Sequence, residues 1–228
     1  MLTVYRKEIK YVIPIEEYLR IKIPLEAIMK KDIYGDQGTY MVRSQYYDSL
    51  YNRDLHDNLS GIMEKRKIRI RLYSTKDETV KLEYKCKSNT DSLKRSILMS
   101  RKEAQQMESH QYEFLLNRTE DLATELYQRM MQGCYRPKTI ITYQRGALSY
   151  PDSDLRITFD TDLRATINPY GLFDEETMQI PMMSQDVGIL EVKYNNYLPY
   201  PIKEIVNSID QLAEANSKYS SARLMYIY

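Results

Sequence analysis

The side chains best suited to chemistry in this chain are cations that recur at every second residue. In the segment KIRIRLY, Lys67, Arg69 and Arg71 alternate with apolar residues. Successive side chains of a β-strand point to opposite faces, so this spacing puts the three cations on one face and the apolar residues on the other. Arginine offers a planar fork for bidentate contacts, and lysine offers a mobile point charge. Both suit phosphate groups, so the pattern indicates binding of a phosphate-rich anion.

The same alternation extends over further segments and concentrates positive charge on one set of faces. These faces hold eleven basic and four acidic residues, a formal charge of +7 against +1 for the whole chain. A solvated face with surface lysines explains any single strand, but like charges on neighbouring strands repel, and a bound polyanion would offset that repulsion. Cations without partners would also destabilise the protein when no ligand is bound, and an anion should then stabilise it. The residues counted are Arg6, Lys10, Lys67, Arg69, Arg71, Lys81, Lys85, Lys87, Arg145, Arg156 and Lys193, with Glu8, Glu83, Asp160 and Glu191.

One acidic residue, Glu191 in the segment GILEVKY, stands among these cations. A carboxylate in such a place can hold a divalent metal ion against phosphate oxygens. It can equally form an ion pair with Lys193 or with an arginine. The spacing leaves both roles open.

The elements that must position these residues are mostly strands. The alternation predicts an α+β fold with an antiparallel sheet of eight strands that can close into a barrel. In a closed barrel the apolar faces turn outward under helices and the charged faces line a basic tunnel. The predicted strands are 4–13, 40–48, 66–73, 79–87, 92–98, 138–147, 154–162 and 187–194.

The helices are recognisable by their ends. Pro14 can begin one helix, whose pattern Pro24 interrupts. Ser100 and Glu103 form a capping box that opens a helix through about residue 108. Thr119 can cap a helix that stops at Gly133. Near the C-terminus, four apolar residues fall on one helical face: Ile202, Ile205, Ile209 and Leu212.

Composition narrows the class of protein. The 228 residues suit a single domain spanning 1–228, and the near-zero net charge argues against a general nucleic-acid-binding protein. RNA binding through the basic strand and nearby tyrosines is a weaker alternative. There is no long apolar run and no secretion signal, so we expect no membrane segment and a cytoplasmic location with Cys86 and Cys134 reduced. Two isolated histidines, His56 and His110, give no zinc-ligand spacing.

Several segments together resemble a known family. The chain is similar to the polyphosphate polymerase domain of the vacuolar transporter chaperone (VTC) proteins, within the triphosphate tunnel metalloenzyme superfamily. The similar segments follow the family order and cover nearly the whole chain. They are YRKEIKY (5–11), SQYYDS (44–49), KIRIRLY (67–73), KLEYKCKSNTDSLKR (81–95), TYQRGAL (142–148), LRITFDTDLRA (155–165), ILEVKY (189–194) and NSKYSSA (216–222).

This resemblance implies an antiparallel tunnel barrel whose basic interior holds a triphosphate and a divalent metal ion, Mn²⁺ or Mg²⁺. It implies that Glu191 binds the metal, that Tyr143 and Ser217 assist, and that Glu8 and Lys193 have supporting roles. The pair Tyr47 and Asp48 also matches the family, but a structural role is expected for it. The residues implied to contact phosphates are Lys10, Arg69, Arg71, Lys85, Lys94, Arg145, Arg156 and Lys218.

The first strand separates two branches of that superfamily. The triphosphatase branch usually carries Glu-x-Glu-x-Lys, whereas positions 6, 8 and 10 are Arg, Glu and Lys here. The resemblance therefore implies a metal-dependent phosphotransferase that moves the γ-phosphoryl group of ATP to a growing polyphosphate chain. The alternatives are a triphosphatase acting on inorganic triphosphate or nucleotides, and a non-catalytic module that binds polyphosphate. The membrane helices and the SPX domain of eukaryotic members are not found in the sequence.

Overall fold

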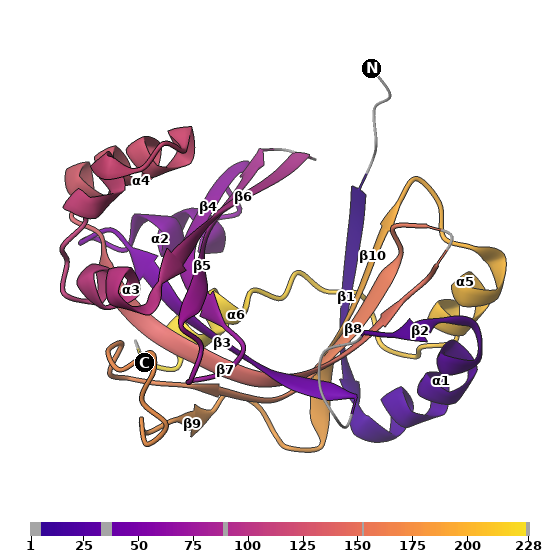
Figure 1. The fold of residues 1–228 in the computed structure, drawn as a ribbon. Helices are drawn as coiled ribbons and strands as arrows, with labels where there is room; N and C mark the ends of the chain where they lie inside the picture. Colours follow the sequence, from indigo (N-terminus) through magenta and orange to yellow (C-terminus); the bar gives the residue numbers. More distant parts are fainter. Residues whose placement is uncertain (1–5, 33–37, 89–90, 152, 227–228) are drawn as a thin grey trace. The chain divides into compact units, whose positions relative to one another are not determined.

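A computed structural model describes residues 6–32, 38–88, 91–151 and 153–226 (Figure 1). The chain divides into two compact units, each built from three separate segments. Unit 1 comprises residues 1–41, 143–164 and 181–217, and unit 2 comprises residues 42–142, 165–180 and 218–228. One strand, β7 (Arg136–Ser149), runs through both units without a break. We therefore propose that the two units fold as the single domain expected from the sequence.

The strands of the described residues belong to one sheet with the order β1-β10-β8-β7-β3-β4-β5-β6, in which β2 pairs with β7 and β9 pairs with β8. Their bounds are β1 (Arg6–Pro14), β2 (Lys30–Lys31), β3 (Thr39–Asp48), β4 (Glu64–Leu72), β5 (Thr79–Ser88), β6 (Asp91–Ser100), β7, β8 (Arg156–Ala165), β9 (Ile180–Pro181) and β10 (Val187–Asn195). The helices are α1 (Ile15–Ile28), α2 (Arg53–Leu59), α3 (Arg101–Glu108), the 3-10 helix η1 (Glu113–Asn117), α4 (Asp121–Gln132), α5 (Tyr200–Asn207) and α6 (Lys218–Leu224).

The predicted antiparallel α+β fold is confirmed. Each of the eight predicted strands corresponds to one of the eight long strands, and the two additional strands of the described residues, β2 and β9, have two residues each. Every described register is antiparallel. The strand order is an open path with β1 and β6 at its ends, and the described residues give no pairing between these two strands.

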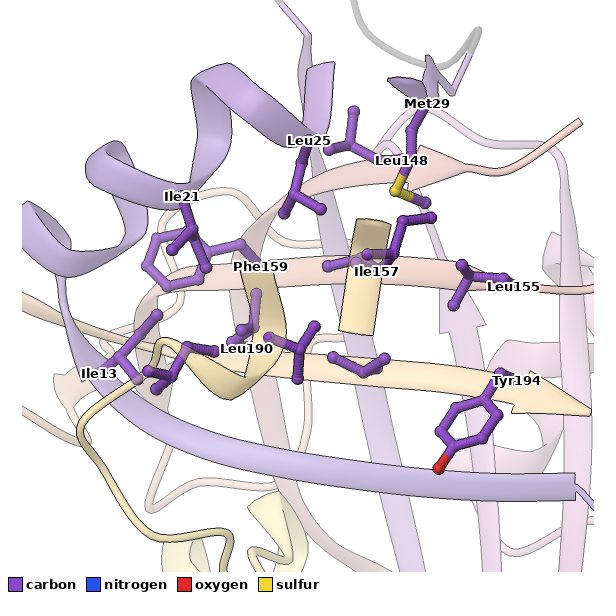
Figure 2. Packing of buried hydrophobic residues seen from close by; sticks show 14 residues of the cluster. Ile13, Ile21, Leu25, Met29, Leu148, Leu155, Ile157, Phe159, Leu190 and Tyr194 are labelled. Carbon is purple, nitrogen blue, oxygen red and sulfur yellow. The ribbon is translucent and has the colours of Figure 1, made fainter. Parts of the chain in front are cut away.

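The core of unit 1 lies between the apolar face of its strands and two helices. Ile157 and Leu190 point from β8 and β10 toward α1, which contributes Ile21 and Leu25 (Figure 2). The helix α5 adds Ile202 to the same cluster. Burying side chains of this size stabilises the unit by about 1.5–3 kcal/mol each. The opposite face of the same strands is left for the charged residues.

Unit 2 repeats this division between two faces. On β4, Ile68 and Ile70 are fully buried, and their pairing partners on β5, Tyr84 and Leu82, are also buried. The helix α3 contacts β5 and β6, and the helix α4, whose buried residues include Leu126, contacts β6. The predicted covering of the apolar strand faces by helices is therefore confirmed within each unit.

The helix ends partly differ from the prediction. The capping box of Ser100 and Glu103 is present at the start of α3. However, α1 continues through Pro24, and Glu120, not Thr119, is the N-cap residue of α4. The helix α5 ends at Asn207, which leaves Leu212 89% exposed, so its predicted place on a buried helical face is wrong.

No helix in the described part of the chain combines the length and the apolar character needed to cross a bilayer.

Candidate phosphate-binding clusters

The charged face of unit 1 is built by register between neighbouring strands. On β1 and β10, Lys10 lies opposite Glu191, and Glu8 lies opposite Lys193. On the other side of β10, Glu191 lies opposite Thr158, and Lys193 lies opposite Arg156. Because opposed residues of an antiparallel pair share a face, positive and negative charges alternate across these strands. We call this group, with Arg145, Asp160 and Asp32, the unit 1 cluster.

Glu191 forms an ion pair in this cluster. Its Oε1 lies 2.7 Å from Nζ of Lys193, and the carboxylate is almost completely buried. Burial alone would raise the pKa of Glu191, but the positive charges of Lys193 and Lys10 outweigh it and hold the pKa below its usual value. The carboxylate is therefore ionised near neutral pH.

Arg145 and Asp160 form a second, buried ion pair. Nε and Nη2 of Arg145 donate to the two carboxylate oxygens of Asp160 at 2.6 and 2.7 Å. Burial opposes the charge on Arg145, but the neighbouring Tyr143 and Asp160 raise its pKa above the usual value. The guanidinium also lies 5.1 Å from the ring centre of Tyr143. This arrangement fixes the plane of the guanidinium.

The remaining two cations of the unit 1 cluster are also paired with carboxylates. Nη2 of Arg156 donates to Asp32 and to the hydroxyl of Tyr40. Nζ of Lys10 lies 3.0 Å from Glu8 and donates to the carbonyl of Asn216, the residue before Ser217. Each cation of the cluster thus has a carboxylate partner, so the expectation of unpaired cations is wrong for this cluster.

The residues around Glu191 fit a metal ion that is shared with phosphate. Mg²⁺ commonly binds one or two carboxylates and takes its other ligands from water and phosphate oxygens. Here Glu8 on β1 is a second carboxylate of the same cluster, and the buried hydroxyl of Thr158, opposite Glu191 in register, has no hydrogen-bond partner. The described residues contain no group of three or more His, Cys, Asp or Glu that could hold a metal alone. The donor set therefore suits a metal ion only together with phosphate.

The charged face of unit 2 is organised around one carboxylate. Glu83 on β5 lies opposite Arg69 on β4 and is 2% exposed. Its Oε2 accepts from Nε of Arg69 at 2.8 Å, its Oε1 lies 2.5 Å from Nζ of Lys94 on β6, and Nη1 of Arg71 lies 3.8 Å from Oε2. Lys85 lies opposite Lys94 in the β5–β6 register. We call these five residues the unit 2 cluster.

The three cations hold Glu83 strongly ionised. Burial would raise the pKa of this carboxyl group, but Arg69, Arg71 and Lys94 lower it to about 2. Lys94 shows the opposite balance, because burial lowers the pKa of its amine more than Glu83 raises it. The side chain of Lys94 is nevertheless 49% exposed, so the cluster is open to solvent at this lysine.

A tyrosine of β3, Tyr46, supports Arg69. The hydroxyl of Tyr46 accepts from Nη1 of Arg69 at 2.8 Å. Burial would raise the pKa of this tyrosine, but Arg69, Arg71 and Lys218 lower it. The ring of Tyr46 stacks on Tyr219, the residue after Lys218, at 5.2 Å between ring centres. Lys218 thus lies close enough to act electrostatically on this group.

The structure brings the predicted residues together in two sets. Within unit 1 it groups Glu8, Lys10, Tyr143, Arg145, Arg156, Glu191 and Lys193, with Ser217 next to the carbonyl that accepts from Lys10. Within unit 2 it groups Arg69, Arg71, Lys85 and Lys94, with Lys218 near Tyr46.

Sequence reasoning missed the partners of these cations. Glu83 entered the sequence-based prediction only through the sum of charges on the strand faces. The alternation of residues in β4 and β5 could have placed Glu83 opposite Arg69. Tyr46 shares its face with Asp48, but its link to Arg69 has no local sequence signal. Asp32, the partner of Arg156, lies outside the long strands.

The expected structural role of Asp48 agrees with its contacts. Its carboxylate accepts from the backbone N–H groups of Asp54 and Leu55 in the first turn of α2 and from the hydroxyl of Tyr219. The neighbouring Tyr47 donates to Gln45. These contacts anchor α2 and α6 to β3.

Comparison with known proteins identifies the family. Residues 5–226 match the VTC domain, whereas no curated protein sequence matches the chain. A candidate adenylyl cyclase from Hippeastrum, with a dominant triphosphatase activity, has a similar structure (TM-score 0.56, 12% identity, 98% of this chain and 96% of that chain covered). A candidate adenylate cyclase from Bacillus halodurans is also similar (TM-score 0.55, 13% identity, 93% and 96% covered). The chain therefore belongs to the VTC domain family and has the fold of triphosphate tunnel proteins.

Proposed function

We propose that this protein is a metal-dependent polyphosphate polymerase that transfers the γ-phosphoryl group of ATP to the end of a growing polyphosphate chain. The observation that carries the proposal is the unit 2 cluster, where three cations contact one carboxylate and a fourth, Lys85, lies opposite Lys94 in register, in a chain of the VTC domain family. An excess of arginine and lysine at one place suits the several negative charges of a phosphate chain. An enzymatic role agrees with the triphosphatase activity of the Hippeastrum protein.

The chemistry of chain extension suits such a site. The attacking group is a terminal phosphate oxygen that is already ionised near neutral pH, so the reaction needs no strong general base. It needs two mutually repelling anions held in line, and cations that offset the developing charge. Under this proposal, Lys10, Arg69, Arg71, Lys85, Lys94, Arg145, Arg156 and Lys218 contact phosphates, Tyr143 and Ser217 assist, and Glu8 and Lys193 support them.

A divalent metal ion would be held by Glu191 together with phosphate oxygens. Such an ion supplies charge neutralisation on the phosphoryl group being transferred. We expect Glu191→Gln to abolish metal-dependent turnover while it spares much of the binding of tripolyphosphate. A loss of tripolyphosphate binding equal to the loss of turnover would contradict this role for Glu191.

The direct test is product analysis. The protein is incubated with ATP and Mn²⁺, and with ATP and Mg²⁺, and the products are separated on a polyacrylamide gel. A ladder of polyphosphate together with ADP is expected. Release of orthophosphate without a ladder would overturn the polymerase proposal.

Triphosphatase activity is the second candidate. The Hippeastrum protein supports it, because a triphosphatase with the same fold can act on similar phosphate chains. The arginine at position 6 of β1 argues against it, since a water nucleophile benefits from carboxylates that orient and deprotonate it. The side chain of Arg6 lies outside the part of the structure that is described. Steady release of orthophosphate from tripolyphosphate would favour this candidate.

A binding module without turnover remains distinguishable by stability. A ligand at one hundred times its dissociation constant stabilises a protein by about 2.7 kcal/mol, which corresponds to roughly 5–11 °C for a domain of this size. We expect tripolyphosphate, but not sulfate at equal ionic strength, to raise the melting temperature this much. Such a shift without any product under Mg²⁺ or Mn²⁺ would establish the binding module.

A further inference from the structure

We infer that Glu83 is a positioning residue and internal counter-ion of the unit 2 cluster, which competes with phosphate for Arg69, Arg71 and Lys94 and so limits how tightly the product is held. This inference rests on the proposed binding of phosphate by these cations. It assigns a role to a carboxylate that would otherwise seem out of place among groups that bind anions.

The contacts of Glu83 differ from those of an ordinary surface pair. The carboxylate is 2% exposed and reaches cations on both neighbouring strands, Arg69 on β4 and Lys94 on β6. Oε2 accepts from Arg69, and Oε1 lies against Lys94, so the two oxygens face different partners. A buried charge needs such partners, because its transfer from water is costly.

The same contacts set the orientation of Arg69. Its Nε donates to Glu83, and its Nη1 donates to the hydroxyl of Tyr46. The guanidinium plane is thereby fixed from two sides before any ligand binds. Preorganised donors lose less entropy when an anion arrives, so this geometry favours ligands whose oxygens match the fork.

The charge of Glu83 has the opposite effect on affinity. A carboxylate that lies within 4 Å of three cations repels an anion bound to those cations. An enzyme that must move along or release a polyanion benefits from this weakening, because product release often limits turnover. Glu83 would thus hold the cations in place while it prevents them from trapping the chain.

Two substitutions separate the charge from the geometry. Glu83→Gln keeps an oxygen that can accept from Arg69 but removes the negative charge, whereas Glu83→Ala removes both. Isothermal titration with tripolyphosphate should give about tenfold tighter binding to Glu83→Gln and a slower release of the ligand than in the unsubstituted protein. Glu83→Ala should bind tripolyphosphate less tightly than Glu83→Gln and should discriminate less between tripolyphosphate and sulfate.

The matched control is Glu125→Gln. Glu125 on α4 pairs with Arg95 on β6 at 2.5 Å. Like Glu83→Gln, this change therefore removes a carboxylate that pairs with an arginine. It alters the net charge equally, and we expect an unchanged affinity for tripolyphosphate. Equal tightening in both variants would overturn the inference, since it would show a general effect of net charge.

The outcomes separate this inference from the proposed function. If the unsubstituted protein binds no tripolyphosphate, both are overturned. If it binds but Glu83→Gln binds equally or less tightly, the role of Glu83 alone is overturned, because a purely structural residue would produce that result. Should Glu83→Gln fail to fold, the test is made in the Lys94→Gln variant. The double variant with Lys94→Gln and Glu83→Gln has the same local net charge as the unsubstituted protein. It must bind tripolyphosphate more tightly than Lys94→Gln alone.

Discussion

The two clusters contain similar residues but balance their charges differently. In the unit 1 cluster, four cations face four carboxylates, in the pairs Lys10–Glu8, Arg145–Asp160, Arg156–Asp32 and Lys193–Glu191. In the unit 2 cluster, Arg69, Arg71 and Lys94 share the single carboxylate of Glu83, and Lys85 lies beside Lys94. The named residues sum to no net charge in the first cluster and to an excess of positive charge in the second.

This difference separates two tasks that the proposed function would require. A set of paired charges is rigid and stable, and it can present a carboxylate such as Glu191 to a metal ion. A set with excess cations is costly in the empty protein but attracts anions. We therefore expect variants of the unit 1 cluster to lose stability first, and variants of the unit 2 cluster to change ligand binding first.

The largest expected effect is the loss of Asp160. Asp160→Ala leaves the guanidinium of Arg145 buried without its carboxylate, and breaking a buried pair in this way costs about 3–5 kcal/mol. The free energy of unfolding in urea measures the change. The double variant Asp160→Ala with Arg145→Met should recover much of the loss, because it removes the unpaired charge. A single variant with unchanged stability would contradict the paired description of this cluster.

The pH dependence of Glu83 comes next. The pKa of Glu83 lies at about 2, below the ordinary value of 4.5, so its ionised form stabilises the folded state above pH 4.5. That contribution is lost as the pH falls through 2. The stability difference between the unsubstituted protein and Glu83→Gln should therefore shrink by about 3 kcal/mol between pH 5 and pH 2.

Asp54 provides the opposite trend as a control for this measurement. Burial and the neighbouring Asp48 raise the pKa of Asp54 to about 7. Its ionisation therefore costs the folded state free energy as the pH rises from about 4 to 7. Asp54→Asn should gain stability relative to the unsubstituted protein over this range. The same direction of change for Asp54→Asn and Glu83→Gln would argue against the assigned environments.

These environments mark the limit of what the sequence could predict. The alternation of Ile68 and Ile70 with Arg69 and Arg71 predicted the two faces of β4, because the period of a strand is a local property. The pairing of Arg156 with Asp32 was not predictable, since it depends on how distant segments meet. Leu212 fits a helical period, but α5 ends before it, because the pattern of apolar residues does not determine where a helix stops.

A smaller effect distinguishes the ligand affinities of the two clusters. Arg71→Gln in the unit 2 cluster should weaken the binding of tripolyphosphate by about 10–100-fold, the equivalent of one or two charge-assisted hydrogen bonds. Arg156→Gln in the unit 1 cluster should weaken it several-fold less, because Arg156 is already engaged by Asp32. Isothermal titration at one salt concentration compares the two. Equal losses would remove the proposed division between the clusters.

The smallest effect concerns ion pairs outside both clusters. Arg164 and Asp162 form an exposed pair in unit 1, and Arg66 and Glu64 form a partly exposed pair in unit 2. Exposed pairs contribute less than about 1 kcal/mol, because water screens them and their side chains lose entropy. Asp162→Asn and Glu64→Gln should each change the free energy of unfolding by less than about 1 kcal/mol. Neither substitution should change the affinity for tripolyphosphate. A tighter binding after Glu64→Gln would mean that net charge, and not the contacts of Glu83, governs the affinity of unit 2.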